Sequence, residues 1–273
     1  MREAGPRALE QKEKNMTSDF VAVRHEFKDD IRIVPIFDAH IGAQECNISR
    51  LEKVIEYIKE NKNVYTIVGG DLLNNGIKSS VTDVYQEAMR PREQKELLYK
   101  MLLPIKDKIL CGHRGNHEYR SSKEVDSCPI YDVFARLGIE DRYRQDAVFM
   151  TITMKRWPAS HNNPAYMICS THGAGGGMYI GSSANKAERF INSMEGVDLV
   201  VMGHTHKPVT FPTSKLVYDS RCGKVVQKQF TVLVASSFLG YGDYPVRKML
   251  GPTAQVMQEI VLSAKEKQIK IIQ

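Results

Sequence analysis

The sequence lacks the features of a membrane-spanning, exported or zinc-finger protein. No stretch approaches the roughly 20 consecutive apolar residues that a membrane helix needs. The first fifteen residues, MREAGPRALEQKEKN, contain no apolar segment of the kind found in a secretory signal. The five cysteines are scattered without CxxC spacing, and their number is odd. We therefore expect reduced thiols in a cytoplasmic protein.

The sequence also lacks a strong charge of either sign. It has 38 basic and 32 acidic residues, which gives a formal net charge of +6. This excess would help an anionic substrate approach, but it is too small to indicate a nucleic-acid binder without chemistry. The 273 residues are 42% hydrophobic, as in an ordinary globular protein. We expect a disordered N-terminal arm over residues 1–16 and a single domain over residues 17–273.

Strand-like and helix-like segments alternate through the first two thirds of the chain. Apolar runs predict strands at 31–37, 63–70, 107–112, 147–154, 165–171 and 198–203. Helical spacing predicts helices at 48–60, within 81–103, at 129–138 and at 184–194. Further short strands are predicted at 208–213, 215–220, 224–229 and 230–237. The pattern indicates an α/β protein with a mostly parallel sheet and some antiparallel strands.

Residue types that bind metals follow five of the first six predicted strands. They stand in DAH (38–40), GD (70–71), GNHE (115–118), TH (171–172) and GHTH (203–206). Ligands bind outside the carboxyl ends of strands in such folds, so we expect all five motifs on one edge of one sheet. Each motif alone is a weak signal, because a Gly-Asp or Gly-Asn pair is commonly a turn. Their coincidence indicates a metal site.

The candidate ligands are carboxylates, imidazoles and one amide, without a thiolate. This set suits borderline divalent ions such as Mn²⁺, Fe²⁺ or Zn²⁺. The ligands are too many for one tetrahedral site but sufficient for two ions that share a carboxylate. Two-metal sites of this kind hydrolyse phosphate esters. The two histidines of GHTH are then expected to be divided between the ions.

In this order, the motifs DxH, GD, GNHE, a later histidine and GHxH resemble those of the calcineurin-like metallophosphoesterases, over roughly residues 31–236. The THGAGGG and ANKAER segments are most similar to short bacterial and bacteriophage members. The resemblance implies a four-layer α/β/β/α sandwich with mixed sheets. It also implies hydrolysis of phosphate esters by a dinuclear metal centre, with Mn²⁺ as the expected ion and Fe²⁺, Zn²⁺ or Ni²⁺ as alternatives.

The resemblance implies a role for each motif residue. The implied ligands are divided between two ions with one bridge: Asp38, His40 and His206 at the first, Asn116, His172 and His204 at the second, and Asp71 between them. His117 would be catalytic rather than a ligand. It would stabilise charge on the phosphoryl group or protonate the leaving oxygen.

The sequence departs from the protein phosphatases of this family three residues after Asp71. These enzymes carry an acid there that orients the catalytic histidine, whereas this chain has Asn74, which can accept a hydrogen bond but supplies no charge. No arginine follows shortly after, as it does in the protein phosphatases. These absences favour phosphodiesters of nucleotides or nucleic acid over phosphoproteins as substrates.

Candidate substrate-binding residues flank the same motifs. Arg114 and Arg120 stand on either side of GNHE, and either could clamp a phosphate oxygen, with Asn74 as a further polar contact. A solvated surface arginine is an equal alternative for Arg114. The alternative functions are a phosphomonoesterase acting on proteins or small molecules, and a non-catalytic interaction module. No membrane partner is expected, and the sequence leaves the oligomeric state open.

Overall fold

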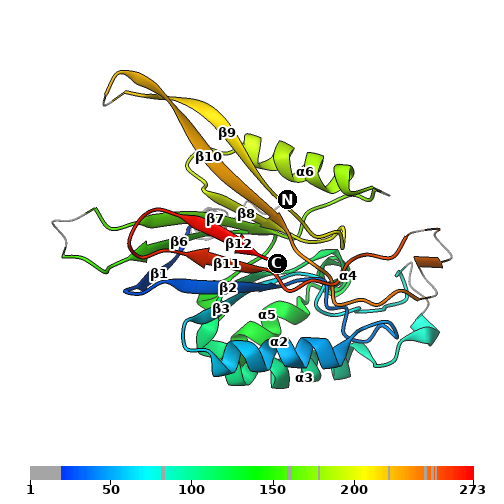
Figure 1. The fold of residues 1–273 in the computed structure, drawn as a ribbon. Helices are drawn as coiled ribbons and strands as arrows, with labels where there is room; N and C mark the ends of the chain where they lie inside the picture. Colours follow the sequence, from blue (N-terminus) through cyan, green and yellow to red (C-terminus); the bar gives the residue numbers. More distant parts are fainter. Residues whose placement is uncertain are drawn as a thin grey trace, which may run out of the picture.

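Two six-stranded sheets pack face to face, and helices cover both outer sides (Figure 1). The computed structural model describes residues 20–80, 84–158, 162–177, 179–220, 222–242, 245–246, 249 and 251–273. Both sheets contain parallel and antiparallel pairs. This is the four-layer α/β/β/α sandwich with mixed sheets that the resemblance implies. The arm predicted for residues 1–16 lies outside the described residues.

The first sheet has the strand order β12-β11-β2-β3-β4-β5. Its strands are β2 (Ile31–Ile36), β3 (Val64–Gly69), β4 (Ile109–His113), β5 (Tyr143–Arg144), β11 (Glu259–Leu262) and β12 (Ile269–Ile272). Strands β2 to β5 are parallel, and β11 and β12 add antiparallel strands beside β2. Because β2, β3 and β4 are covered on both faces, their sequences are apolar runs rather than alternating patterns.

The second sheet has the strand order β1-β6-β7-β8-β10-β9. Its strands are β1 (Val23–Phe27), β6 (Ala147–Met154), β7 (Ala165–Thr171), β8 (Leu199–Met202), β9 (Val209–Asp219) and β10 (Lys224–Val234). The four short strands predicted over 208–237 form two long strands that pair as one antiparallel hairpin. Pro212 does not interrupt β9, because β9 is an edge strand and proline is tolerated there.

Helices cover the first sheet with α2 (Ile48–Glu60), α3 (Pro91–Leu102) and α5 (Pro129–Leu137), and the second with α6 (Ile180–Asn192) (Figure 1). Short 3-10 helices are η1 (Val84–Gln86), η2 (Leu103–Lys108) and η3 (Glu140–Arg142). Pro91 begins α3 instead of interrupting a longer helix, a position where its missing N–H is harmless. Helix α6 begins four residues before the predicted 184. The sequence did not predict α4 (Asn116–Val125), which begins inside GNHE.

Three hydrophobic clusters lie between the four layers. One joins α2, α3 and α5 to the first sheet, one lies between the sheets, and one joins α6 to the second sheet. The middle cluster includes Phe37 and Met150, both fully buried, and it fixes the two sheets relative to each other. In the described part of the chain, no helix is both long and apolar enough to span a membrane.

Candidate metal centre

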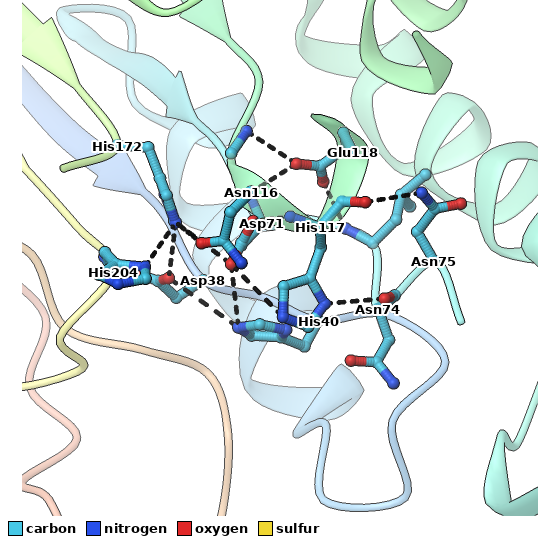
Figure 2. Close-up of polar contacts among 12 residues, drawn as sticks. Asp38, His40, Asp71, Asn74, Asn75, Asn116, His117, Glu118, His172 and His204 are labelled. Atoms are coloured by element: carbon cyan, nitrogen blue, oxygen red, sulfur yellow. Dashed lines mark hydrogen bonds and ion pairs between the residues drawn. The ribbon is translucent and has the colours of Figure 1, made fainter. Parts of the chain in front are cut away.

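The predicted ligands follow strands of both sheets and converge at one end of the sandwich (Figure 2). Those after the first sheet's strands are Asp38 and His40 (β2), Asp71 (β3) and Asn116 (β4), and those after the second sheet's are His172 (β7), His204 and His206 (β8). The expectation that all lie on one edge of one sheet is therefore wrong. Two sheets each contribute their carboxyl ends, because the core between them brings those ends together.

Five of the seven predicted ligands have a backbone held in an unusual conformation. Positive φ angles occur at Asp38 (49°), His40 (48°), Asp71 (48°), His204 (71°) and His206 (56°). Non-glycine residues in this left-handed region cost about 1 kcal/mol or more each. Such residues cluster where the surrounding structure needs a side chain aimed in one direction, and here each turn directs its side chain toward a common point.

The first cluster consists of Asp38, His40 and His206. Nε2 of His40 lies 3.2 Å from Nε2 of His206. Oδ1 of Asp38 lies 3.3 Å from Nε2 of His206 and 3.9 Å from Nε2 of His40. Metal–nitrogen bonds of roughly 2.0–2.1 Å at tetrahedral angles would place two ligand nitrogens about 3.4 Å apart. The spacing is therefore that of ligands to one ion.

The second cluster consists of Asp71, His172 and His204. Nε2 of His172 lies 3.1 Å from Oδ2 of Asp71 and 3.2 Å from Nδ1 of His204. It also lies 3.1 Å from Oδ1 of Asn116. Oδ2 of Asp71 lies 4.0 Å from Nε2 of His40, so this carboxylate faces both clusters. The two histidines of GHTH are placed in different clusters.

One buried oxygen shows that the site suits a cation. Within the described part of the chain, Oδ1 of Asp38 has no hydrogen-bond partner, although this side chain is fully buried. Three imidazole Nε2 atoms lie within 4.0 Å of it, those of His206, His40 and His172. A buried carboxylate is costly unless it is paired or bound to a metal. The donor set and this buried oxygen, which faces three imidazole nitrogens, fit a divalent ion.

The electrostatics of the second cluster also call for positive charge. Burial alone would lower the pKa of His172, but the carboxylates of Asp71, Asp38 and Glu118 together outweigh burial, Asp71 most, and raise that pKa to about 9. Burial would raise the pKa of Asp71, but His172 and His117 outweigh it and hold that pKa well below its ordinary value. Both shifts reflect a negative potential at this position, which favours a cation there.

His117 lies beside both clusters with one ring nitrogen already engaged. Nδ1 lies 2.8 Å from the backbone oxygen of Asn74, and its backbone N–H donates to Oδ1 of Asp71 at 2.8 Å. Because a carbonyl can only accept, Nδ1 carries a proton and Nε2 can exchange one with a substrate. Burial lowers the pKa of His117, Asp71 opposes this, and Arg120 adds to the lowering. His40, Asp71 and His117 also lie close enough together to hold one ion. That His117 is not a ligand is therefore a proposal, which the metal content of a His117 variant tests.

The predicted substrate contacts differ in their surroundings. Nη1 of Arg120 lies 3.4 Å from the carbonyl oxygen of Asn74, beside His117. Nε of Arg114 lies 3.0 Å from Oδ1 of Asp146, and its guanidinium stacks on Tyr119 at 4.7 Å. The side chain of Asn74 does not face His117; its backbone carbonyl accepts that hydrogen bond instead.

Glu118 is a site residue to which the sequence assigned no role. It is fully buried, and its carboxylate accepts hydrogen bonds from the backbone N–H groups of Asp71 (2.9 Å), Leu73 (3.0 Å) and Gly115 (2.8 Å). Burial raises the pKa of Glu118 to about 7, and the charge of Asp71 acts in the same direction. The sequence feature that could have revealed this role is an acid at the third position of a helix, from which it can cap the helix start.

The fold and the site together define a class: an α/β/β/α protein with two Asp/His clusters at its strand ends. A family model described as calcineurin-like phosphoesterase matches residues 31–208, more than half of the chain. The chain belongs to the calcineurin-like phosphoesterases, which are hydrolases that act on phosphate esters with a dinuclear metal centre. The match ends at residue 208, before the 236 that the sequence motifs and following strands suggested.

Three solved structures with a similar chain share little sequence with it. A predicted phosphoesterase from Streptococcus pneumoniae TIGR4 is 12% identical over 89% of this chain and 97% of its own, with a TM-score of 0.34. YfkN from Bacillus subtilis is 13% identical over 89% and 90%, with a TM-score of 0.37. GAP50 of Plasmodium, the anchor in the inner membrane complex, is 10% identical over 90% and 89%, with a TM-score of 0.43. At such TM-scores we base no conclusion on these likenesses. No curated protein matches the sequence.

Proposed function

We propose that this chain is a two-metal phosphodiesterase that hydrolyses nucleotides or nucleic acid. The observation that supports it is the pair of Asp/His clusters with Asp71 facing both, beside a histidine whose Nε2 lies 3.7 Å from Oδ2 of Asp71. The oxygen and imidazole donors, without thiolate, favour Mn²⁺, with Fe²⁺, Zn²⁺ and Ni²⁺ as alternatives. The five cysteines are unpaired, which supports a cytoplasmic location.

The roles in this proposal follow from position. Asp38, His40 and His206 would hold one ion, Asn116, His172 and His204 the other, and Asp71 would contact both. When bound, such ions supply a nucleophilic water and neutralise phosphoryl charge. Nδ1 of His117 donates to the Asn74 carbonyl, so Nε2 is the nitrogen that faces the substrate; in the imidazolium form it carries the second proton, which it gives to the leaving oxygen. Arg120, beside His117, contacts a phosphoryl oxygen in this scheme.

The charges around His117 support a diester over a monoester. The guanidinium of Arg114 is engaged by Asp146, and its side chain is only 10% exposed. Arg120 lies close enough to the Glu87 carboxylate to affect its pKa. Of these two arginines, Arg114 is therefore paired with an acid, and the charge of Arg120 is partly balanced by Glu87. A monoester carries a charge of about −1.5 to −2 at neutral pH, whereas a diester carries one negative charge and needs fewer cationic partners.

The test compares two substrates with the same leaving group. Mn²⁺-loaded protein should bind close to two ions per chain and give a higher kcat/KM with bis(p-nitrophenyl) phosphate than with p-nitrophenyl phosphate. Single- and double-stranded DNA would then be compared, and a chelator should abolish hydrolysis. Monoester hydrolysis faster by tenfold, about 1.4 kcal/mol in barrier, would identify a phosphatase instead. Two bound ions without any hydrolysis would identify a non-catalytic interaction module.

A further inference from the structure

A polar network behind His117 ends on an acid that stands outside all of the motifs. Asn74, whose carbonyl accepts from Nδ1 of His117, is itself nearly buried (Figure 2). Its side-chain Nδ2 donates to Oε1 of Glu87 at 2.5 Å. Glu87 lies directly after η1, thirteen residues farther along the chain. Asn74, which stands where the protein phosphatases of the family carry an acid, is thus hydrogen-bonded to the carboxylate of Glu87.

Both oxygens of Glu87 are engaged. Oε2 accepts from Nε2 of Gln94 at 2.5 Å, and Gln94 is fully buried. Oε1 of Gln94 in turn accepts from the backbone N–H of Asn75 at 2.9 Å. The network therefore holds the Asn74–Asn75 turn at two points. Gly76 leaves room for it, because a β-carbon at residue 76 would overlap the Glu87 carboxylate.

We propose that Glu87 is a positioning residue for His117. By fixing the Asn74 side chain, it keeps the Asn74 carbonyl directed at Nδ1 of His117. Nδ1 then stays protonated, and Nε2 is the nitrogen that faces the substrate. The proposal rests on the catalytic role proposed for His117, and it gives this chain a substitute for the acid that Asn74 replaces.

The donors and acceptors of the network suggest a reciprocal exchange. Glu87 offers two acceptors to two donors, Nδ2 of Asn74 and Nε2 of Gln94. Glu87→Gln places one amide donor against another donor, and Asn74→Asp places two carboxylates together; both arrangements lose hydrogen bonds. The double variant restores every partner, because the new Asp accepts from the new Gln, whose oxygen still accepts from Gln94.

Four proteins form a double-mutant cycle, with Glu93→Gln as a matched control on α3. Each single variant should lower kcat on a dinucleotide by about tenfold or more, since small misplacements near a reacting group are costly. Turnover of bis(p-nitrophenyl) phosphate should change little, because its leaving group needs little protonation. Each variant should retain its metal content, and the double variant should recover to within about threefold. Glu93→Gln should match the wild type.

A spectroscopic measurement decides the proposal independently of activity. In ¹⁵N spectra of the Zn²⁺-loaded protein, His117 should be protonated at Nδ1, should lose that preference in both single variants and should regain it in the double variant. Equal losses on both substrates, or a double variant that recovers neither turnover nor the tautomer, would overturn the positioning role. If the wild-type protein hydrolyses neither diester while the tautomers respond as expected, the proposed function is wrong and the positioning role stands.

Discussion

His117 is the residue at which two explanations of the site diverge most. If it is a ligand, replacing it removes metal; if it acts on the substrate, both ions remain. We expect His117→Asn to retain two ions per chain and the native fold, because Nδ1 is directed at the Asn74 carbonyl rather than at either ion. Turnover of dinucleotides should fall by about 10²–10⁴, and turnover of bis(p-nitrophenyl) phosphate much less. Steady-state kinetics with metal analysis checks this, and a loss of one ion would make His117 a ligand.

Asp71 and His206 offer a second contrast among single residues. Oδ2 of Asp71 lies 3.1 Å from His172 in one cluster and 4.0 Å from His40 in the other, whereas His206 belongs only to the first cluster. We expect Asp71→Asn to lower the affinity for both ions and His206→Ala to weaken mainly one. Metal content after dialysis against graded chelator separates these outcomes. Full occupancy and normal turnover in Asp71→Asn would exclude a bridging role.

The sequence predicted site residues only where they belong to a motif of a few consecutive residues. DxH, GNHE and GHxH are each read within four residues, and the structure brings them together. The contact between Asn74 and Glu87 could not be read in this way, because it depends on the path of the chain between them. The pairing of Arg114 with Asp146 likewise spans 32 residues.

Among the elements, α4 carries a side chain that is hydrogen-bonded to both the GD motif of Asp71 and the GNHE motif of Asn116. Its only buried residue is Glu118, whose carboxylate binds backbone N–H groups on both sides of the site. Glu118→Gln replaces one acceptor oxygen with a donor that faces an N–H group. Leaving a buried donor unsatisfied costs about 1–3 kcal/mol. We expect that loss in urea unfolding of the metal-free protein, with weaker metal binding. Glu124→Gln, an exposed change on the same helix, should have no measurable effect; equal stability of the two variants would refute the structural role of Glu118.

The same helix shows why some elements escaped prediction. Helix α4 has no apolar face, so it lacks the hydrophobic periodicity by which α2 was found with its observed bounds. Strands β11 and β12 have four residues each; β11 pairs with β2 and β12 with β11, far along the chain from β2, which no local pattern reveals. Strands β2, β3 and β4 were predicted because burial on both faces leaves a continuous apolar run.

On the scale of the whole molecule, the last part of the chain is joined to the strand that carries the first metal cluster. Ile260 of β11 is paired with Ile33 of β2, and β2 leads directly into Asp38. Ile260 and Leu262 are also fully buried in the cluster between the sheets. These contacts support the proposal that residues 17–273 form a single domain. In such a domain, a destabilising substitution in β11 should also cause loss of metal from the site.

Ile260→Ala tests this coupling, with Ile272→Ala as its control. Removing a fully buried isoleucine side chain costs about 2–5 kcal/mol, a large part of the 5–15 kcal/mol that stabilises a typical domain. Ile272 is 53% exposed, so its truncation should change the free energy of unfolding by less than about 0.5 kcal/mol. Because the sheets share one core, we expect secondary structure and metal to be lost in one coincident transition, shifted to lower urea by Ile260→Ala. Two separate transitions, with metal retained after the first, would show that the C-terminal strands belong to an independent unit.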